Sequence, residues 1–249
     1  MQHRTDPLER RRLEGLDRAA LEEAQLRQFG ELLAKILPTN VFYRNKLAGC
    51  APPTTLEEFR QLPFTTKPEL IGSAPGGNWA ANLTYPRERY LRYHQTSGTH
   101  GRPLVLLDTA DDWQWWMECW QYVLDAIEVN SADRVLMAFS FGPFVGFWSA
   151  HDAVAERSAM VVPGGGLSTT ARLQLLADCE ATIVFSTPSY LLRMAEVAAE
   201  TGFDLAALPV RCVIAAGEPG GSIGSIRAAI EHAWGARVLD HSGATEVGP

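Results

Sequence analysis

The chain has 249 residues and a net charge of −7, from 22 basic and 29 acidic side chains. Its length suits one large domain or two small ones, and its 46% share of hydrophobic residues is enough for a buried core. An acidic chain has no general electrostatic attraction to nucleic acid or to an anionic membrane. We therefore expect neither class of partner, and an anionic ligand must be held by a local group of donors.

The sequence also argues against secretion, membrane insertion and a disulfide scaffold. Residues 1–20 contain no apolar stretch after their charged residues, so they do not resemble a secretory signal. The sequence contains no run of about 18 apolar residues, so it predicts no membrane-spanning helix. The cysteines Cys50, Cys119, Cys179 and Cys212 are scattered and form no CxxC pair, which is typical of reduced thiols in the cytoplasm.

Residues 1–90 are expected to form a region of helices and loops. The spacing of apolar residues over 17–37 predicts an amphipathic helix, and Pro38 ends it because proline cannot continue a helix. Thr55 is a candidate N-cap for a short helix. Residues 72–89 are rich in glycine and proline and predict a loop.

Short apolar runs alternate with helical stretches from residue 104 onward. The expected strands are 104–107, 134–140, 159–162, 181–186, 211–216 and 236–240, and the expected helices between them are 111–128, 143–156, 169–179, 189–201 and 222–233. This alternation predicts an α/β fold, a layered domain with a mainly parallel sheet within residues 91–249. Ligands of such sheets bind beyond the carboxyl ends of the strands, so the loops after the strands are the expected site.

Residues 96–103, Thr-Ser-Gly-Thr-His-Gly-Arg-Pro, are rich in glycine and hydroxyl side chains. Glycines let the backbone turn its N–H groups toward a ligand, and the hydroxyls add further donors. Such a nest suits a polyphosphate, although the glycine-lysine-serine ending of a Walker loop is absent. The alternative is an ordinary surface turn, which often has this composition.

The C-terminal segment 240–246, Asp-His-Ser-Gly-Ala-Thr-Glu, follows an expected strand. Glu246 can hold a hard cation such as Mg²⁺, which takes oxygen ligands and commonly bridges to phosphates. Thr245 can donate to a phosphate oxygen. The alternative is a turn with a solvated glutamate, because charged residues are mostly exposed.

Two further segments have weaker patterns. Residues 215–219, Ala-Ala-Gly-Glu-Pro, follow a strand and can border a flat heterocycle, but a plain turn is the favoured interpretation. Residues 139–148 hold four phenylalanines and a tryptophan, which suits either an apolar acid pocket or ordinary core packing. Core packing is favoured for Phe139, and the two interpretations are balanced for Phe141.

Two other residue types are interpreted as structural. Trp113, Trp116 and Trp120 share one face of an expected helix. We expect them to pack against the core rather than to stack on nucleic-acid bases, because no basic patch accompanies them. The six histidines show no metal-ligand spacing.

Taken together, these segments resemble the adenylate-forming superfamily of acyl-CoA synthetases, and in particular its phenylacetate–CoA ligase branch. Residues 96–103 look like the family's phosphate loop, Thr/Ser-Ser-Gly-Thr-Thr-Gly-Lys-Pro. Residues 240–246 are similar to its Tyr-Gly-x-Thr-Glu motif, and 216–219 resemble its Gly-Ala-Glu-Pro adenine segment. Residues 42–44 and 62–67 also resemble the branch's N-terminal signature, so the likeness covers nearly the whole chain.

The resemblance implies an ATP-dependent ligase with Mg²⁺ that converts a carboxylic acid to an acyl-adenylate and then to a CoA thioester. It assigns Thr96, Ser97, Gly98, Thr99, Gly101 and Arg102 to the phosphates, and Ala216, Gly217, Glu218, Pro219 and His241 to the adenine side. It assigns Thr245 to the α-phosphate and Glu246 to Mg²⁺, and we expect Phe141 and Phe147 in the acid pocket. The four phenylalanine and tryptophan side chains near 141–148 favour an aromatic or bulky apolar acid.

The sequence departs from the family pattern at several positions. His100 replaces a threonine, Arg102 stands at the usual lysine, and His241 with Ser242 replaces an aromatic residue and its neighbour. The family's later ribose-binding aspartate, hinge and C-terminal lysine do not follow Glu246. We therefore expect a partial N-terminal domain of the fold, incomplete as an enzyme, from either a fragment or a naturally short protein.

Two alternatives stay open at this point. The acceptor of the acyl group can be a carrier-protein thiol instead of CoA, because the phosphate and metal residues would be the same. A truncated, non-catalytic nucleotide-binding module is the alternative from another class, favoured by His100 and disfavoured by the intact glycines and Glu246. A homodimer is a further expectation.

Overall fold

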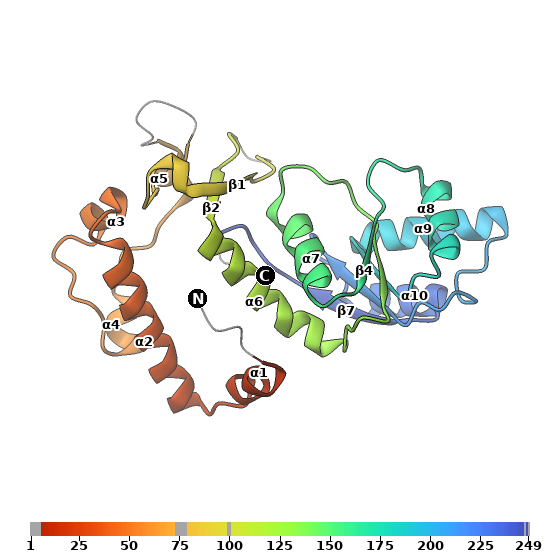
Figure 1. The fold of residues 1–249 in the computed structure, drawn as a ribbon, viewed down its shortest axis with the longest axis horizontal. Helices are drawn as coiled ribbons and strands as arrows, with labels where there is room; N and C mark the ends of the chain where they lie inside the picture. Colours follow the sequence, from red (N-terminus) through yellow and green to blue (C-terminus); the bar gives the residue numbers. More distant parts are fainter. Residues whose placement is uncertain (1–5, 73–78, 99–100, 247, 249) are drawn as a thin grey trace. The chain divides into compact units, whose positions relative to one another are not determined.

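The computed structural model describes residues 6–72, 79–98, 101–246 and 248. The chain divides into two compact units, Met1–Asp112 and Trp113–Pro249, each described here by itself (Figure 1). The sequence predicted a boundary between residues 90 and 91. The following segment stays with the first unit because Leu104 packs with Leu70 and Ala80 in that unit's small core.

The first unit, unit 1, consists mainly of helices, and each of the first four has a polar N-cap side chain. They are α1 (Pro7–Glu14), α2 (Arg18–Ile36), α3 (Val41–Lys46), α4 (Leu56–Arg60), α5 (Lys67–Gly72) and the 3₁₀ turn η1 (Arg87–Arg89). The predicted helix 17–37 is confirmed as α2. Thr55 is the N-cap of α4, as predicted. It forms a capping box with Glu58, in which each side chain accepts the backbone N–H of the other residue.

Unit 1 also contains a two-stranded hairpin, β1 (Tyr90–Gln95) and β2 (Val105–Thr109). The strands pair antiparallel, with His94 opposite Leu106 and Gln95 opposite Val105. The prediction that residues 104–107 open the parallel sheet was therefore wrong. Their partner β1 has the sequence Tyr-Leu-Arg-Tyr-His-Gln, which contains neither an apolar run nor a regular alternation of polar and apolar residues, so the sequence did not indicate it as a strand.

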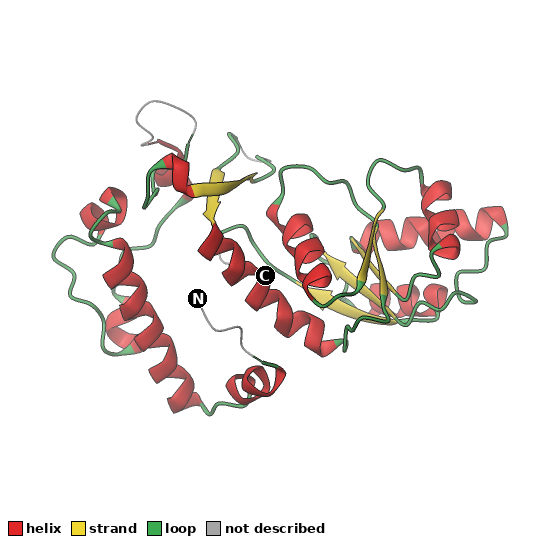
Figure 2. Cartoon of the chain, in the orientation of Figure 1, coloured by secondary structure: helices red, strands yellow, loops and turns green. Residues whose placement is uncertain are grey.

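The second unit, unit 2, is built on a five-stranded parallel sheet, which confirms the predicted α/β fold (Figure 2). Its strands are β3 (Arg134–Met137), β4 (Met160–Pro163), β5 (Ile183–Ser186), β6 (Cys212–Ala216) and β7 (Arg237–His241). Its helices are α6 (Ala110–Ala126), which begins in the last residues of unit 1, α7 (Val145–Glu156), α8 (Thr169–Asp178), α9 (Pro188–Thr201) and α10 (Gly224–Trp234). Every strand from β3 to β7 and every helix from α6 to α10 corresponds to a predicted element.

Alternate residues of each strand point into two separate cores, because successive side chains of a strand face opposite sides of the sheet. Val135, Ile183 and Ile214 belong to the core that α6 and α7 cover. Leu136 and Val184, one position along, belong to the core that α8, α9 and α10 cover. The sheet is thus buried on both faces, as expected for parallel strands.

The strand order is β4-β3-β5-β6-β7, so the chain changes direction across the sheet between β4 and β5. The connection through α7 runs to one side of β3, and all later connections run to the other side. The carboxyl ends of β3 and β5 meet at this switch point, where Ala138 N–H donates to Phe185 O at 2.9 Å. Open α/β sheets bind their ligands at such a point.

Among the described residues, no helix has the length and apolar character to cross a membrane.

Candidate active site

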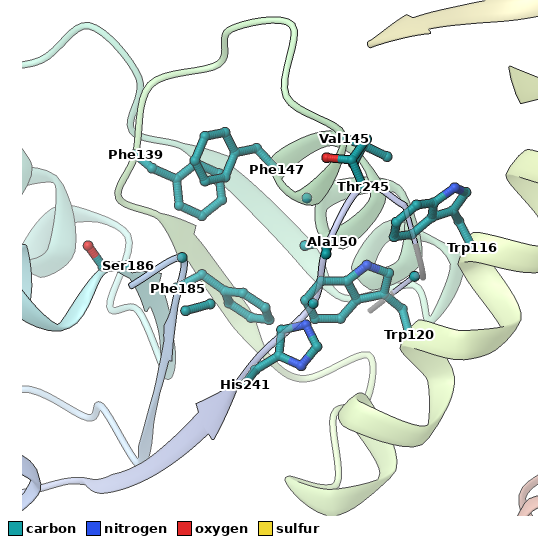
Figure 3. Close-up of a pocket in the computed structure, with 16 residues that line it drawn as sticks. Trp116, Trp120, Phe139, Val145, Phe147, Ala150, Phe185, Ser186, His241 and Thr245 are labelled. Carbon is teal, nitrogen blue, oxygen red and sulfur yellow. The ribbon is translucent and has the colours of Figure 1, made fainter. Parts of the chain in front are cut away.

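An apolar cavity of about 170 Å³ lies in unit 2 at the carboxyl ends of the parallel strands (Figure 3). The ends of β3, β5, β6 and β7 contribute to its wall, together with α6 and α7. Aromatic side chains form much of the lining, among them Trp116, Trp120, Phe139, Phe147 and Phe185. The predicted site, the loops after the strands, therefore contains a cavity whose chemistry is mainly apolar.

The cavity has a buried end and an exposed rim. Trp120 is 3% exposed and Phe185 is 2% exposed. Gly217, Gly243 and Ala244, which also line the cavity, are exposed. A ligand can therefore place an apolar group at the buried end and keep a polar group at the rim, where backbone groups of these residues are available.

The tryptophans of α6 do more than the predicted core packing. Trp116 and Trp120 line the cavity, whereas Trp113 donates its indole N–H to Asp152 Oδ2 at 3.0 Å and is not part of the lining. The Trp120 indole N–H donates to Ser149 Oγ at 2.8 Å. Sequence reasoning found their common helix face but missed the cavity, because the sheet residues on its far side are distant in sequence.

The two phenylalanines predicted for the acid pocket lie in different places. Phe147 lines the cavity and stacks on Phe139, with ring centroids 4.1 Å apart and planes 22° apart. Phe141 packs against Trp148 at 4.9 Å and does not line the cavity. Phe139, expected to be core, takes the place in the lining that was expected of Phe141.

His241 also lies in the cavity wall, beside Trp120, with ring centroids 4.5 Å apart. Burial lowers the pKa of its imidazole, and the nearby carboxylate of Asp240 only partly offsets this effect. His241 is therefore neutral at physiological pH. It was predicted for the adenine side, and the structure places its ring against the aromatic wall of the cavity.

The segment after β6 approaches the same cavity from another side. Ala216 and Gly217 line the cavity, and Gly217 has a φ of +92°, a conformation that favours glycine. Glu218 turns away from the cavity, and its Oε1 accepts the backbone N–H of Ser189 at 2.7 Å. Hydrogen bonds from Ser189 lower the pKa of Glu218, which sits at the N-terminus of α9.

Thr245 and Glu246 lie in a tight turn at the end of the described chain. Ala244 and Gly248 close it with two backbone hydrogen bonds, of 3.1 and 2.9 Å. Thr245 lines the cavity, and Glu246 is exposed. The described residues contain no group of three or more His, Cys, Asp or Glu that could hold a metal ion, so Mg²⁺ at Glu246 would need the oxygens of a phosphate as its other ligands.

The glycine-rich segment of unit 1 connects β1 and β2 and is held at both ends. Thr96 Oγ1 accepts the backbone N–H of Leu104 at 3.0 Å and the amine of Lys67 at 3.1 Å. Gly98 has a φ of +70°, and its carbonyl accepts the N–H of Gly101 at 3.0 Å. The turn thus requires glycine at position 98, where an added Cβ would lie 2.9 Å from Gly101 O.

Two of the remaining predicted residues of this segment lie at the surface. Ser97 and Arg102 are exposed, whereas Thr99 and His100 lie outside the described residues. Lys67, the first residue of α5, was not predicted as a site residue. It lies 29 positions before Thr96, so only the folded structure shows that its amine belongs to this segment.

No protein-family model matches the sequence. The phenylacetate–coenzyme A ligase of Pseudomonas putida is 31% identical over 232 residues, which make up 92% of this chain and 52% of the relative. The Escherichia coli K12 enzyme of the same name is 31% identical over 244 residues, 95% of this chain and 54% of the relative. The chain therefore spans about half the length of the curated relatives it matches.

The chain also matches about half of a ligase of known structure. A 2-hydroxyisobutyryl-CoA ligase, in complex with 2-HIB-AMP and CoA in the thioesterification state, matches with a TM-score of 0.90 and 26% identity. The match covers 100% of this chain and 55% of the ligase.

Proposed function

Because this chain belongs to the adenylate-forming acyl-CoA synthetases, in their phenylacetate–CoA ligase-like branch, we propose that it binds a carboxylic acid and ATP and activates the acid as an acyl-adenylate. In the complete ligase, the acyl group then passes to the thiol of CoA. The observation that carries this proposal is the aromatic cavity at the switch point of the sheet, with glycines and Thr245 at one side.

The first step joins the acid to the α-phosphorus of ATP. A carboxylate oxygen forms the new bond to phosphorus, and the bond to the leaving pyrophosphate breaks. In the second step the CoA sulfur forms the thioester bond, and AMP leaves with the oxygen that the acid had contributed. Neither step needs a covalent bond to the protein, so the protein contributes positioning and the neutralisation of charge.

The acyl group fits the cavity of unit 2 with its carboxylate at the rim. The buried end offers aromatic and aliphatic side chains, and the described residues of the lining include no lysine, arginine, aspartate or glutamate. Backbone groups of Gly217 and Gly243 and the hydroxyl of Thr245 are the polar groups near the reacting carboxylate. This division places apolar atoms of the acid away from water and its charge near the nucleotide.

The phosphates are assigned to the glycine-rich segment of unit 1. Lys67 and Arg102 supply positive charge there, and the hydroxyls of Thr96 and Ser97 and the backbone near Gly98 supply hydrogen-bond donors. Glu246 is assigned to Mg²⁺, whose chemistry is to offset the negative charge on the phosphates during attack. Glu218 is better explained as the residue that anchors the adenine segment to α9.

We propose that the acid is aromatic or otherwise bulky and apolar. The curated relatives are phenylacetate–CoA ligases, whereas the solved structure belongs to a ligase of a small hydroxylated acid. The aromatic lining favours the first class, because burial of apolar surface contributes about 25 cal/mol per Å². We also place the reaction in the cytoplasm, where the four free cysteines stay reduced.

The test is acid-dependent exchange of pyrophosphate into ATP by the ligase that contains this chain, followed by AMP release with CoA. We expect exchange with phenylacetate to exceed exchange with acetate or 2-hydroxyisobutyrate. Preference for either small acid would contradict the aromatic assignment. Exchange without AMP release on addition of CoA would indicate a carrier-protein thiol as acceptor, and ATP binding without exchange would indicate a non-catalytic module.

A further inference from the structure

The buried end of the cavity is closed by the indole of Trp120, which three elements hold in place. Its N–H donates to Ser149 Oγ on α7 at 2.8 Å, and Ser149 Oγ donates to Gly146 O at 3.3 Å. The ring of His241 from β7 lies 4.5 Å from the indole, and the ring of Phe185 from β5 lies 6.0 Å away. Figure 3 shows the Trp120 indole beside the His241 ring. Together these contacts leave the indole little freedom to swing aside.

We propose that Trp120 determines the length of the acyl group that this site accepts, an inference that rests on the proposed function. The cavity of about 170 Å³ is similar in volume to an engineered apolar cavity of about 150 Å³ that binds benzene. One ring on a short arm therefore fills the space between the rim and Trp120. A longer acid must displace an indole that is fixed on three sides.

The energetics make this limit sharp. A methylene that is buried without a clash increases affinity about fourfold. A methylene that presses against a well-packed wall instead lowers affinity by about 5- to 150-fold. Affinity should therefore rise with acid size up to one ring on a short arm and fall beyond it.

The chemistry of the buried end also excludes a second charge on the acid. His241 is a titratable side chain beside the Trp120 ring, and burial lowers its pKa, which favours the neutral form. The described lining residues include no lysine or arginine to pair with a distal carboxylate. The accepted acids are therefore monocarboxylic acids whose far end is apolar.

The test compares the affinity of the 249-residue chain for acylsulfamoyl adenosines, stable mimics of an acyl-adenylate. The series carries phenylacetyl, phenylpropionyl and phenylbutyryl groups. We expect the wild type to bind the phenylacetyl mimic about tenfold or more tightly than the phenylbutyryl mimic. Trp120→Leu should abolish or reverse this ranking, because leucine leaves space at the buried end.

Trp113→Phe on the same helix is the matched control and should keep the wild-type ranking, because Trp113 contacts Asp152 and does not line the cavity. An unchanged ranking in Trp120→Leu, with the phenylacetyl mimic still bound, would overturn the role of Trp120. If Trp120→Leu does not fold, Ser149→Ala frees the indole and should improve phenylbutyryl binding about threefold; no improvement counts against the proposal. A wild type that binds none of the mimics contradicts the proposed function itself and is thus a separate result.

Discussion

Unit 1 and unit 2 hold their candidate binding residues in different ways. In unit 2 the cavity borders a core of buried strand and helix side chains, so apolar packing fixes the lining. In unit 1 the glycine-rich segment lies at the end of a two-stranded hairpin over a cluster of three buried residues. Its shape depends on individual hydrogen bonds, such as those that Thr96 accepts from Leu104 and Lys67.

This difference suggests that the two units have different roles in binding. A rigid apolar pocket can select an acid by shape, since a packed core tolerates little change in volume. A polar segment held by a few hydrogen bonds instead offers charge and hydrogen-bond donors to phosphates. If this difference holds, substitutions in unit 2 should mainly change stability, and those in the glycine-rich segment of unit 1 should mainly change nucleotide binding.

The largest expected effect is on stability. Leu176→Ala removes a fully buried side chain from the core of unit 2 and should lower the free energy of unfolding by about 3–5 kcal/mol. Leu70→Ala, in the small cluster of unit 1, should cost only about 2 kcal/mol, the low end for such a substitution, because the surrounding residues can collapse into the space. Urea denaturation of both variants measures the difference, and equal costs would contradict the comparison.

The next effect concerns the metal. Glu246→Gln removes the exposed charge while keeping the side-chain size. Acid-dependent pyrophosphate exchange by the ligase that contains this chain should slow by about 10²–10³, and the thermal melt should not change. Glu180→Gln, an exposed carboxylate at the opposite, amino end of β5, is the control. Normal exchange by Glu246→Gln at low Mg²⁺ would show that Glu246 is not the metal ligand, and a collapsed melt would show a structural role.

Lys67 tests the polar segment of unit 1. Lys67→Met keeps the length of the side chain but removes its charge and its hydrogen bond to Thr96. We expect ATP to bind about tenfold more weakly, because a hydrogen bond to a charged group contributes about 1.5–3 kcal/mol. Lys35→Met, whose amine pairs with Asp111 instead, should leave ATP affinity unchanged. Equal affinities of all three proteins in a calorimetric titration would remove Lys67 from the site.

The smallest effect separates a structural from a nucleotide-binding role of Glu218. Its pKa is lowered in the folded state, chiefly by the hydrogen bonds from Ser189. The carboxylate of Glu218 therefore stabilises the folded state above the unfolded-state pKa of about 4.3. This stabilisation disappears as the pH falls through the lower folded-state pKa. At neutral pH, Glu218→Gln should cost about 0.3–1 kcal/mol at this helix N-terminus, and the difference from wild type should vanish in acid.

Glu200→Gln, near the other end of α9, is the control for this pH dependence. Thermal melts of the three proteins between neutral and acidic pH give the comparison. Weaker ATP binding by Glu218→Gln at unchanged stability would instead support the adenine role that the sequence suggested.

The sequence predicted unit 2 better than unit 1, for physical reasons. The strands of unit 2 are buried on both faces, so they appear as continuous apolar runs such as 134–140 and 181–186. Strand β1 and helices α3 and α5 lack such a signal, because they are short and mostly at the surface. Residues 215–219 and 240–246 lie at the carboxyl edge of the parallel sheet, as the sequence predicted. The contacts of Lys67 and Trp120, in contrast, depend on residues that lie far away in sequence.

The central claim is that the cavity of unit 2 holds the acyl group of an adenylate. A crystal structure of the chain with the phenylacetyl sulfamoyl adenosine mimic tests it most directly. We predict the phenyl ring inside the cavity, in contact with Trp120 and Phe147, and the sulfamoyl group at the rim beside Gly217 and Thr245. A mimic bound with its ring outside this cavity, or an unchanged cavity in a saturated crystal, would contradict the account.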